Sequence, residues 1–213
     1  MDRGSEIAAL GETARAAFEE KHRAREITIT ASRQAIQACA ASIRSTHRGE
    51  YDAAEALARE ARDHLAAADD ALAGQPDVRT GGPLNDAKKE LAEAWLTLAL
   101  VRNEPLPTPD ELGIEIAAYC NGLAEAASEL RRQLLDQLRA GELARAEELM
   151  GAMDEIYSLL VTIDYPDGVT GGLRRTTDAL RAVLERTRGD LTTSMVAARL
   201  QAAIESARDV SRA

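Results

Sequence analysis

The stretch LNDAKKELAEAWLTLALVR, residues 84–102, decides the fold class. Its large apolar residues recur at helical spacing and form one core-facing stripe of Leu84, Leu91, Trp95 and Leu98. A second row is acidic, because residues three and four apart share one side of a helix, and it contains Asp86, Glu90 and Glu93. The stretch therefore predicts an amphipathic helix that starts near Pro83 or Leu84 and ends near Arg102.

The composition extends this prediction to the whole chain. Hydrophobic residues make up 45% of the 213 residues but aromatic residues only 3%, so the apolar set is dominated by the helix formers Ala and Leu. Short runs rich in Val, Ile, Tyr or Phe, which would indicate strands, are almost absent. We predict an all-α protein, long enough to bury a substantial core.

Breakers and caps divide the chain into six or seven helices of one domain, residues 1–213. The breaker 74–83 ends the second helix, Thr108 begins the fourth through a capping box, and the turn 165–168 precedes the sixth. Gly189 either breaks the sixth helix or lies inside it. The predicted helices span residues 5–48, 51–72, 84–102, 108–140, 143–163, 173 onward and about 192–209.

Charge and cysteine content restrict the function classes. The net charge of −10 argues against a broad basic surface for nucleic acid, but it permits a local basic patch or a metal site made of carboxylates. Cys39 and Cys120 are too far apart in sequence for a metal knuckle and are expected to be reduced packing residues. With neither a signal-peptide core nor a membrane-length apolar run, we expect a cytoplasmic protein without membrane contact.

The fourth predicted helix carries a second acidic pair, Glu125 and Glu129. Both lie on the side opposite the apolar residues Ile116, Leu123, Leu130 and Leu134. From periodicity alone, the favoured interpretation is that both acidic pairs face solvent. Like charges three or four apart destabilise a helix by only tenths of a kcal/mol. Lys88 and Lys89 are not expected to face Glu90 and so do not relieve its repulsion from Glu93.

The alternative interpretation is a divalent-metal site. Mg²⁺ prefers oxygen ligands, and ions held by a carboxylate cluster can support phosphodiester cleavage. Other sites fit less well: a di-iron bundle needs two Glu-x-x-His motifs, and only Glu19 to His22 offers one. Zinc has no His/Cys cluster to bind, and each histidine is expected on the surface or in helix contacts, namely His22, His47 and His64.

Several segments resemble the translin superfamily, which contains translin and translin-associated factor X. AYCNGLAEAASELRR, residues 118–132, is similar to a family helix that keeps tyrosine, glycine, an acid and then Glu-Leu before a basic residue. KELAEAW, residues 89–95, resembles the Glu-x-x-Glu segment of the factor X branch. Weaker matches are REIT at residues 25–28 and ALAREARDHL at residues 56–65. The resemblance covers about residues 18–193.

The resemblance implies a seven-helix bundle that assembles into a hollow homo-oligomer, typically an octamer, and binds single-stranded RNA or DNA. It also implies an endoribonuclease dependent on Mg²⁺, or on Mn²⁺, with the acidic cluster of the catalytic branch falling on Glu90, Glu93, Glu125 and Glu129. Glu125 stands where that branch has aspartate. Contacts to RNA phosphates are expected from Arg25, Arg33 and Arg132.

Two further functions remain open at this point. A translin-like assembly can bind single-stranded nucleic acid without cleaving it. An all-α nucleoside triphosphate pyrophosphatase also uses a Glu-x-x-Glu motif, although its second acidic motif usually lies nearer in sequence than Glu125 and Glu129 do here.

Overall fold

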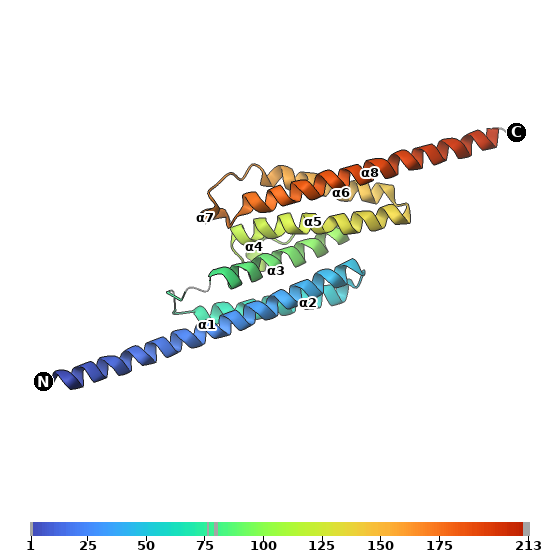
Figure 1. Cartoon of the computed structure of the whole chain (residues 1–213). Coiled ribbons are helices and arrows are strands. Elements are labelled where there is room, and N and C mark those ends of the chain that lie inside the picture. Colours follow the sequence, from blue (N-terminus) through green and yellow to red (C-terminus); the bar gives the residue numbers. More distant parts are fainter. Residues whose placement is uncertain (1, 76, 79–80, 211–213) are drawn as a thin grey trace.

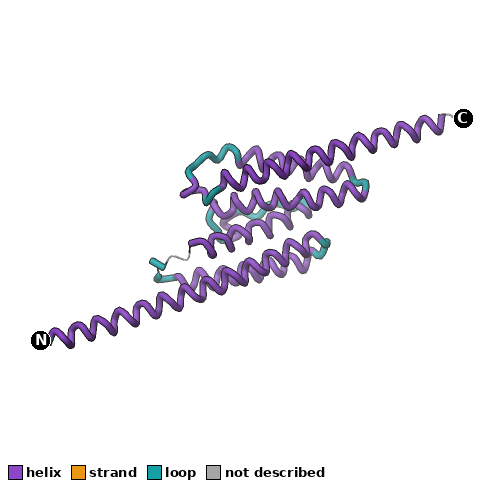
Figure 2. Tube along the Cα trace, in the orientation of Figure 1, coloured by secondary structure: helices purple, strands orange, loops and turns teal. Residues whose placement is uncertain are grey.

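The all-α prediction is confirmed by the structure, a computed structural model that describes residues 2–75, 77–78 and 81–210. Within these residues there are eight helices and no strand. Figures 1 and 2 show how the helices are arranged. The helices are α1 (Arg3–His47), α2 (Tyr51–Leu72), α3 (Gly81–Arg102), α4 (Pro109–Leu112), α5 (Ile116–Ala140), α6 (Leu143–Leu160), α7 (Asp167–Thr170) and α8 (Leu173–Val210). Of the predicted breaker, Pro76, Arg79 and Thr80 lie outside the described residues. None of the described helices is both long and apolar enough to cross a membrane.

The helices stack in a regular order. α1 and α2 form a hairpin, α3 lies between α1 and α5, and α5 also contacts α6 and α8. In Figure 1 the N-terminal part of α1 and the C-terminal part of α8 project beyond this stack at opposite ends. The exposed N-terminal half of α1 begins at a cap in which Asp2 accepts a hydrogen bond from the amide of Gly4. The helices α3 and α5, which carry the acidic pairs, therefore lie side by side in the middle of the molecule.

The core is made mainly of alanine and leucine, so the helices approach one another closely. One cluster extends from α1 and α2 through α3, α4 and α5 to parts of α6 and α8, and a second joins the end of α3 with α5, α6 and α8. Leu91, Leu130 and Leu134 are fully buried, as their spacing predicts. The prediction for Ile116 is wrong: it begins α5 at the edge of the bundle and is 64% exposed.

The fourth predicted helix is in fact two helices. Thr108 and Glu111 form the predicted capping box, but the helix that they start ends after one turn at Leu112. Gly113 follows with a φ of 67°, a left-handed conformation that ends helices and that glycine adopts at no steric cost. α5 then starts at Ile116.

The last part of the chain is one helix instead of two. α8 runs without a break from Leu173 to Val210, so Gly189 lies inside it and no separate helix starts near residue 192. The predicted tight turn at 165–168 is instead the start of α7, a single helical turn for which Pro166 is the N-cap. Continuous helical hydrogen bonding outweighs the weak breaking tendency of one glycine.

Candidate metal centre between α3 and α5

The crossing of α3 and α5 is tight because Gly122 has no side chain. A Cβ at this position would lie 2.5 Å from the Cβ of Ala92, 2.6 Å from the carbonyl oxygen of Lys89 and 2.9 Å from the amide nitrogen of Glu93. Real Cβ atoms are essentially never this close to backbone atoms. Gly122 therefore lets the backbone of α5 lie directly against the turn of α3 that carries Glu90 and Glu93.

Three of the four predicted carboxylates meet at this crossing. Glu90, Glu93 and Glu125 each place one carboxylate oxygen within 4.8 Å of the others. Glu93 is only 9% exposed, and the side chains of Glu90 and Glu125 keep 27% and 29% of their surface exposed. The interpretation favoured by periodicity alone, that these acids face solvent, is therefore wrong, because α5 and α1 cover that side of α3.

Burial changes the protonation of the cluster. Removal from water raises the pKa of Glu93 well above its usual range, and the neighbouring charges of Glu90 and Glu125 raise it further. Burial also raises the pKa of Glu90, although the charge of Lys89 opposes this effect. The cluster thus holds a proton more tightly than free carboxylates do unless another cation compensates its charge.

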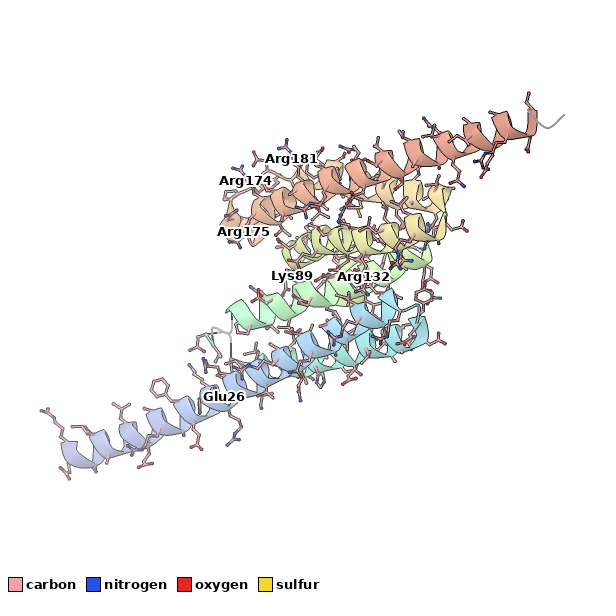
Figure 3. The ribbon with its side chains drawn as sticks, turned by 45° about the vertical axis from the view of Figure 1, so that its right-hand side comes forward. Glu26, Lys89, Arg132, Arg174, Arg175 and Arg181 are labelled. Carbon is pink, nitrogen blue, oxygen red and sulfur yellow. The ribbon has the colours of Figure 1, made fainter. Side chains whose placement is uncertain are left out.

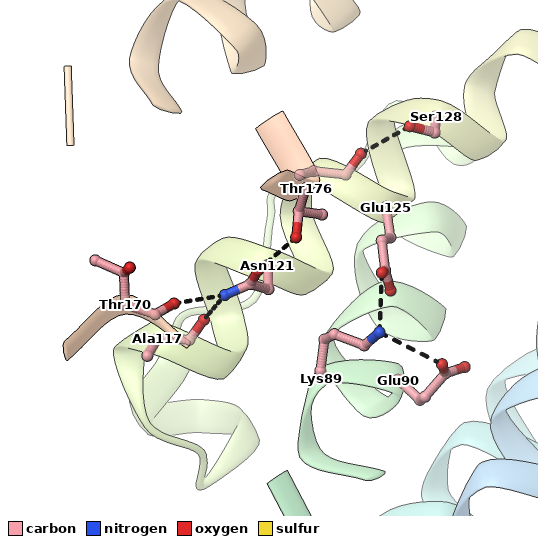
Figure 4. Close-up of polar contacts among 9 residues, drawn as sticks. Lys89, Glu90, Ala117, Asn121, Glu125, Ser128, Thr170 and Thr176 are labelled. Atoms are coloured by element: carbon pink, nitrogen blue, oxygen red, sulfur yellow. Dashed lines mark hydrogen bonds and ion pairs between the residues drawn. The ribbon is translucent and has the colours of Figure 1, made fainter. Parts of the chain in front are cut away.

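Lys89 supplies part of that compensation, contrary to the expectation from sequence. Its Nζ donates a hydrogen bond of 2.9 Å to Glu125 Oε1 and lies 3.8 Å from Glu90 Oε1, as Figure 4 shows. The backbone positions of adjacent residues do point apart, but the four-carbon stem of lysine is long enough to turn back toward Glu90. Burial alone would lower the pKa of Lys89, but the hydrogen bond to Glu125 and the nearby acids outweigh it and raise that pKa.

Glu129 is held by a residue that the sequence did not single out for this site. Nε2 of His47, from the end of α1, lies 2.6 Å from Glu129 Oε2, and the histidine side chain is only 3% exposed. Nδ1 of His47 is buried without a hydrogen-bond partner among the described residues. An imidazole that carries its proton on Nε2 donates to Glu129 and leaves only a lone pair unsatisfied. No sequence signal connects these two residues, which are 82 positions apart.

α1 forms the third wall of the site. Cys39 is fully buried on this helix, and burial, with smaller contributions from the charges of Glu90 and Glu93, raises the pKa of its thiol. A thiol held protonated in this way is a poor metal ligand and nucleophile. Cys39 therefore serves as the packing residue that its sequence context predicts.

The predicted RNA-contacting arginines lie outside the cluster. Arg25 and Arg33 are exposed on α1, and Arg25 pairs with Glu26 at 2.8 Å. Arg132 is exposed on α5 and is labelled in Figure 3. Arg33 and Arg132 make no ion pair with another described residue. The structure thus leaves both available for a ligand but does not gather the three at one place.

The donor set fits a hard divalent cation. Carboxylate oxygens are the protein ligands that Mg²⁺ prefers, and such sites usually retain several waters, which the exposed parts of Glu90 and Glu125 would admit. Mg²⁺ binds oxygen at about 2.0–2.1 Å, so the three carboxylates, whose oxygens lie within 4.8 Å of one another, would have to move closer together around one ion. Zinc, which is usually bound through cysteine and histidine, would find one protonated thiol here and a histidine already bonded to Glu129.

Comparisons with known proteins agree with this architecture. No family model matches the chain. A curated relative, the uncharacterized protein MJ0175 of Methanocaldococcus jannaschii, is 30% identical over 175 residues, which span 81% of this chain and 77% of that protein. The structure of AfC3PO in complex with duplex RNA superposes with a TM-score of 0.79 at 32% identity, covering 87% of this chain and 96% of AfC3PO.

Two further solved structures show the same fold. A second crystal structure of AfC3PO gives the same TM-score of 0.79, at 32% identity over 87% of this chain and 97% of that one. Apo-NeC3PO, at 20% identity and a TM-score of 0.70, covers 88% of this chain and 96% of its own. C3PO is the complex of translin and translin-associated factor X. With a relative above 30% identity that is matched over nearly its full length, this chain belongs to the translin superfamily.

Proposed function

We propose that the protein is an Mg²⁺-dependent endoribonuclease that acts on single-stranded RNA within a homo-oligomer. The observation that carries the proposal is the meeting of Glu90, Glu93 and Glu125 from two helices within 4.8 Å. Burying three acids together destabilises a fold, so an arrangement of this kind is expected where a cation is to be bound. Mn²⁺, which accepts the same ligands, should replace Mg²⁺.

The chain's own residues would perform three tasks. Glu90, Glu93 and Glu125 would hold the ion, which when bound activates water and stabilises the leaving oxygen of a phosphodiester. Glu129, oriented by His47, lies beside this set and would accept a proton or a water hydrogen bond at its free oxygen. Gly122 keeps the two helices close enough for the three ligands to act on one ion.

RNA as the ligand is supported by the relatives. AfC3PO, at 32% identity, has been solved in complex with duplex RNA. We propose that this chain also binds RNA and that cleavage requires a single strand, because only a flexible backbone can bend toward carboxylates that are more than half buried. The exposed Arg33 and Arg132 would contribute phosphate contacts outside the metal site.

Assembly is supported by the two projecting helix ends. The N-terminal part of α1 exposes Ile7, Leu10 and Phe18, and the C-terminal part of α8 exposes Val196, Leu200, Ile204 and Val210. A helix that extends into water with an apolar stripe and no tertiary contact is not stabilised by burial. We propose that these ends are covered by further copies of the chain and that the oligomer is an octamer.

Cleavage of a labelled single-stranded oligoribonucleotide with Mg²⁺, with Mn²⁺ and with EDTA tests the proposal. The wild-type protein should cleave internally with either metal, and Glu90→Gln and Glu125→Gln should each lower the rate at least about 100-fold. Glu147→Gln, a change at an exposed acid of α6, is the matched control and should leave the rate unchanged. Unchanged cleavage by correctly folded Glu90→Gln protein would show that the carboxylate cluster takes no part in the reaction.

One observation favours a second function, translin-like RNA binding without cleavage. Lys89 already occupies a carboxylate oxygen of Glu125, so it competes with a divalent cation for that ligand. Measuring both binding and cleavage of duplex and single-stranded oligonucleotides separates the two functions. Tight binding with no product in Mg²⁺ or Mn²⁺ would establish the binding function, and release of pyrophosphate from a nucleoside triphosphate would instead establish the pyrophosphatase.

A further inference from the structure

A cavity of about 290 Å³ opens beside the carboxylate cluster, between α3, α5 and the start of α8. Glu125 belongs to both the cluster and the cavity, so the two spaces are contiguous. Two cationic side chains line the cavity, Lys89 from α3 and Arg175 from α8.

Arg175 has no acidic partner, unlike the arginine that precedes it. Arg174, the preceding residue, makes an ion pair of 2.6 Å with Asp164, and Arg188, farther along α8, makes one of 2.5 Å with Asp154. Arg175 makes no ion pair with any described residue, and its Nη2 would lie 3.4 Å from a Cβ added at Gly172. Figure 3 labels Arg174 and Arg175 at the start of α8. The guanidinium that lines the cavity thus has its hydrogen-bond donors available for an anion.

The start of α8 is fixed rigidly, and so is the base of the Arg175 side chain. Asn121 of α5 donates hydrogen bonds of 2.8 Å to the carbonyl oxygens of Ala117 and Thr170, and its Oδ1 accepts one of 2.7 Å from the Thr176 hydroxyl. Figure 4 shows this network beside Lys89 and Glu125. A buried side chain that satisfies three polar groups at once holds the α7–α8 junction against α5.

The cavity also contains two carboxylates, Asp86 and Glu125, so its formal charges balance when no metal is bound. A divalent cation on the cluster would neutralise Glu125 and release Lys89 from it. The cavity would then be positive and complementary to a phosphate. Anion binding at Arg175 and cation binding at the cluster are therefore expected to strengthen each other, by the same factor in both directions.

We propose that this cavity is a phosphate subsite in which Arg175 and Lys89 hold a backbone phosphate of RNA next to the metal centre. The inference rests on the proposed function and deepens it, because it names the residues that position the strand beside the carboxylates. Arginine suits this role because its planar guanidinium can donate two parallel hydrogen bonds to one phosphate.

Equilibrium binding of a short labelled oligoribonucleotide to Arg175→Gln and Arg174→Gln tests the inference. Both variants remove one positive charge from adjacent positions, but only Arg175 lines the cavity. In Mn²⁺, with the RNA shown to be intact after each titration, Arg175→Gln should bind about tenfold more weakly than wild type. The slope of log Kd against log salt concentration should be smaller for Arg175→Gln, by about the amount expected for the loss of one phosphate contact. Arg174→Gln should match the wild type in both respects.

The metal dependence provides a second readout. In EDTA the difference between Arg175→Gln and wild type should shrink to about twofold, because the carboxylates then offset the two cations. Equal binding by the two variants in Mn²⁺, whether both are unchanged or both equally weakened, would overturn the subsite while leaving RNA binding by the wild type intact. Failure of the wild type itself to bind RNA in any condition would overturn the proposed function, and the subsite with it. Unchanged thermal unfolding of both variants shows that a loss of binding is not a loss of fold.

Discussion

Gly122 is the residue on which the spacing of the carboxylate cluster depends. Gly122→Ala would place a methyl group 2.5–2.9 Å from atoms of Ala92 and Glu93, so α3 and α5 would have to separate. We expect the free energy of unfolding to fall by about 1–3 kcal/mol and Mn²⁺ binding to weaken as well. Denaturant unfolding and calorimetric titration with Mn²⁺ measure the two effects.

Gly151→Ala is the matched control for this change. Gly151 lies in α6, where a Cβ would meet no described atom within 4 Å. The same substitution should therefore stabilise the protein by about 0.5–1 kcal/mol, since alanine loses less conformational freedom than glycine in a helix. If the free energy of unfolding rose for both variants, the crossing of α3 and α5 at Gly122 would have room for a methyl group.

The burial of Glu93 leads to a prediction of how the stability of the protein depends on pH when divalent cations are absent. Burial, with the charges of Glu90 and Glu125, raises the pKa of Glu93 in the folded state, whereas the unfolded chain ionises it near its ordinary value. Between these two pKa values the folded state binds the proton that the unfolded state has released. The free energy of unfolding should therefore fall as the pH rises through this interval.

Glu93→Gln, which cannot ionise, should flatten that dependence and raise the melting temperature above pH 7 in EDTA. Adding Mn²⁺ should stabilise the wild type more than this variant, because a bound cation replaces the proton. Thermal melts across pH check both expectations, with the exposed Glu147→Gln as control. Parallel pH curves for wild type and Glu93→Gln would contradict the buried position of this acid.

The sequence identifies the site only in part, for reasons that lie in individual side chains. Helical spacing places Glu90 beside Glu93 and Glu125 beside Glu129, and the family resemblance brings the two pairs together. Spacing rules describe where side chains start and not where long ones end, which is why they do not predict the contact of Lys89 with Glu125. The contact of His47 with Glu129 depends on the packing of α1 and carries no local signal.

At the scale of the helix, a substitution at Gly189 tests whether α8 is one continuous helix. It lies inside a helix that runs from Leu173 to Val210, and a Cβ there would meet no described atom within 4 Å. Gly189→Ala should therefore raise the free energy of unfolding by about 0.5–1 kcal/mol and increase helicity slightly. Circular dichroism and thermal unfolding measure this, and destabilisation by the alanine would indicate that the helix breaks there.

Helix boundaries show what local signals can and cannot decide. The capping box at Thr108 is strong and is present, but α4 ends after four residues because Gly113 adopts a left-handed conformation that its residue type permits and does not require. Gly189, by contrast, has an ordinary helical backbone. The same residue type ends one helix and continues another, because tertiary contacts of the flanking segments decide between the two outcomes.

At the scale of the whole molecule, the projecting ends predict a concentration-dependent assembly. Leu200→Glu places a charge on the apolar stripe of α8, and Leu10→Glu does so on that of α1, while neither residue belongs to the described core. Both variants should reduce the molar mass measured by light scattering without lowering helix content. Val169→Glu, at an exposed apolar residue of α7, should leave the mass unchanged.

A crystal structure of the protein soaked in Mn²⁺, with anomalous scattering measured for the metal, tests the central claim most directly. The proposed function predicts an anomalous peak between α3 and α5, ligated by oxygens of Glu90, Glu93 and Glu125, with Lys89 moved away from Glu125. The absence of a peak at saturating Mn²⁺, with Lys89 still bonded to Glu125, would contradict it.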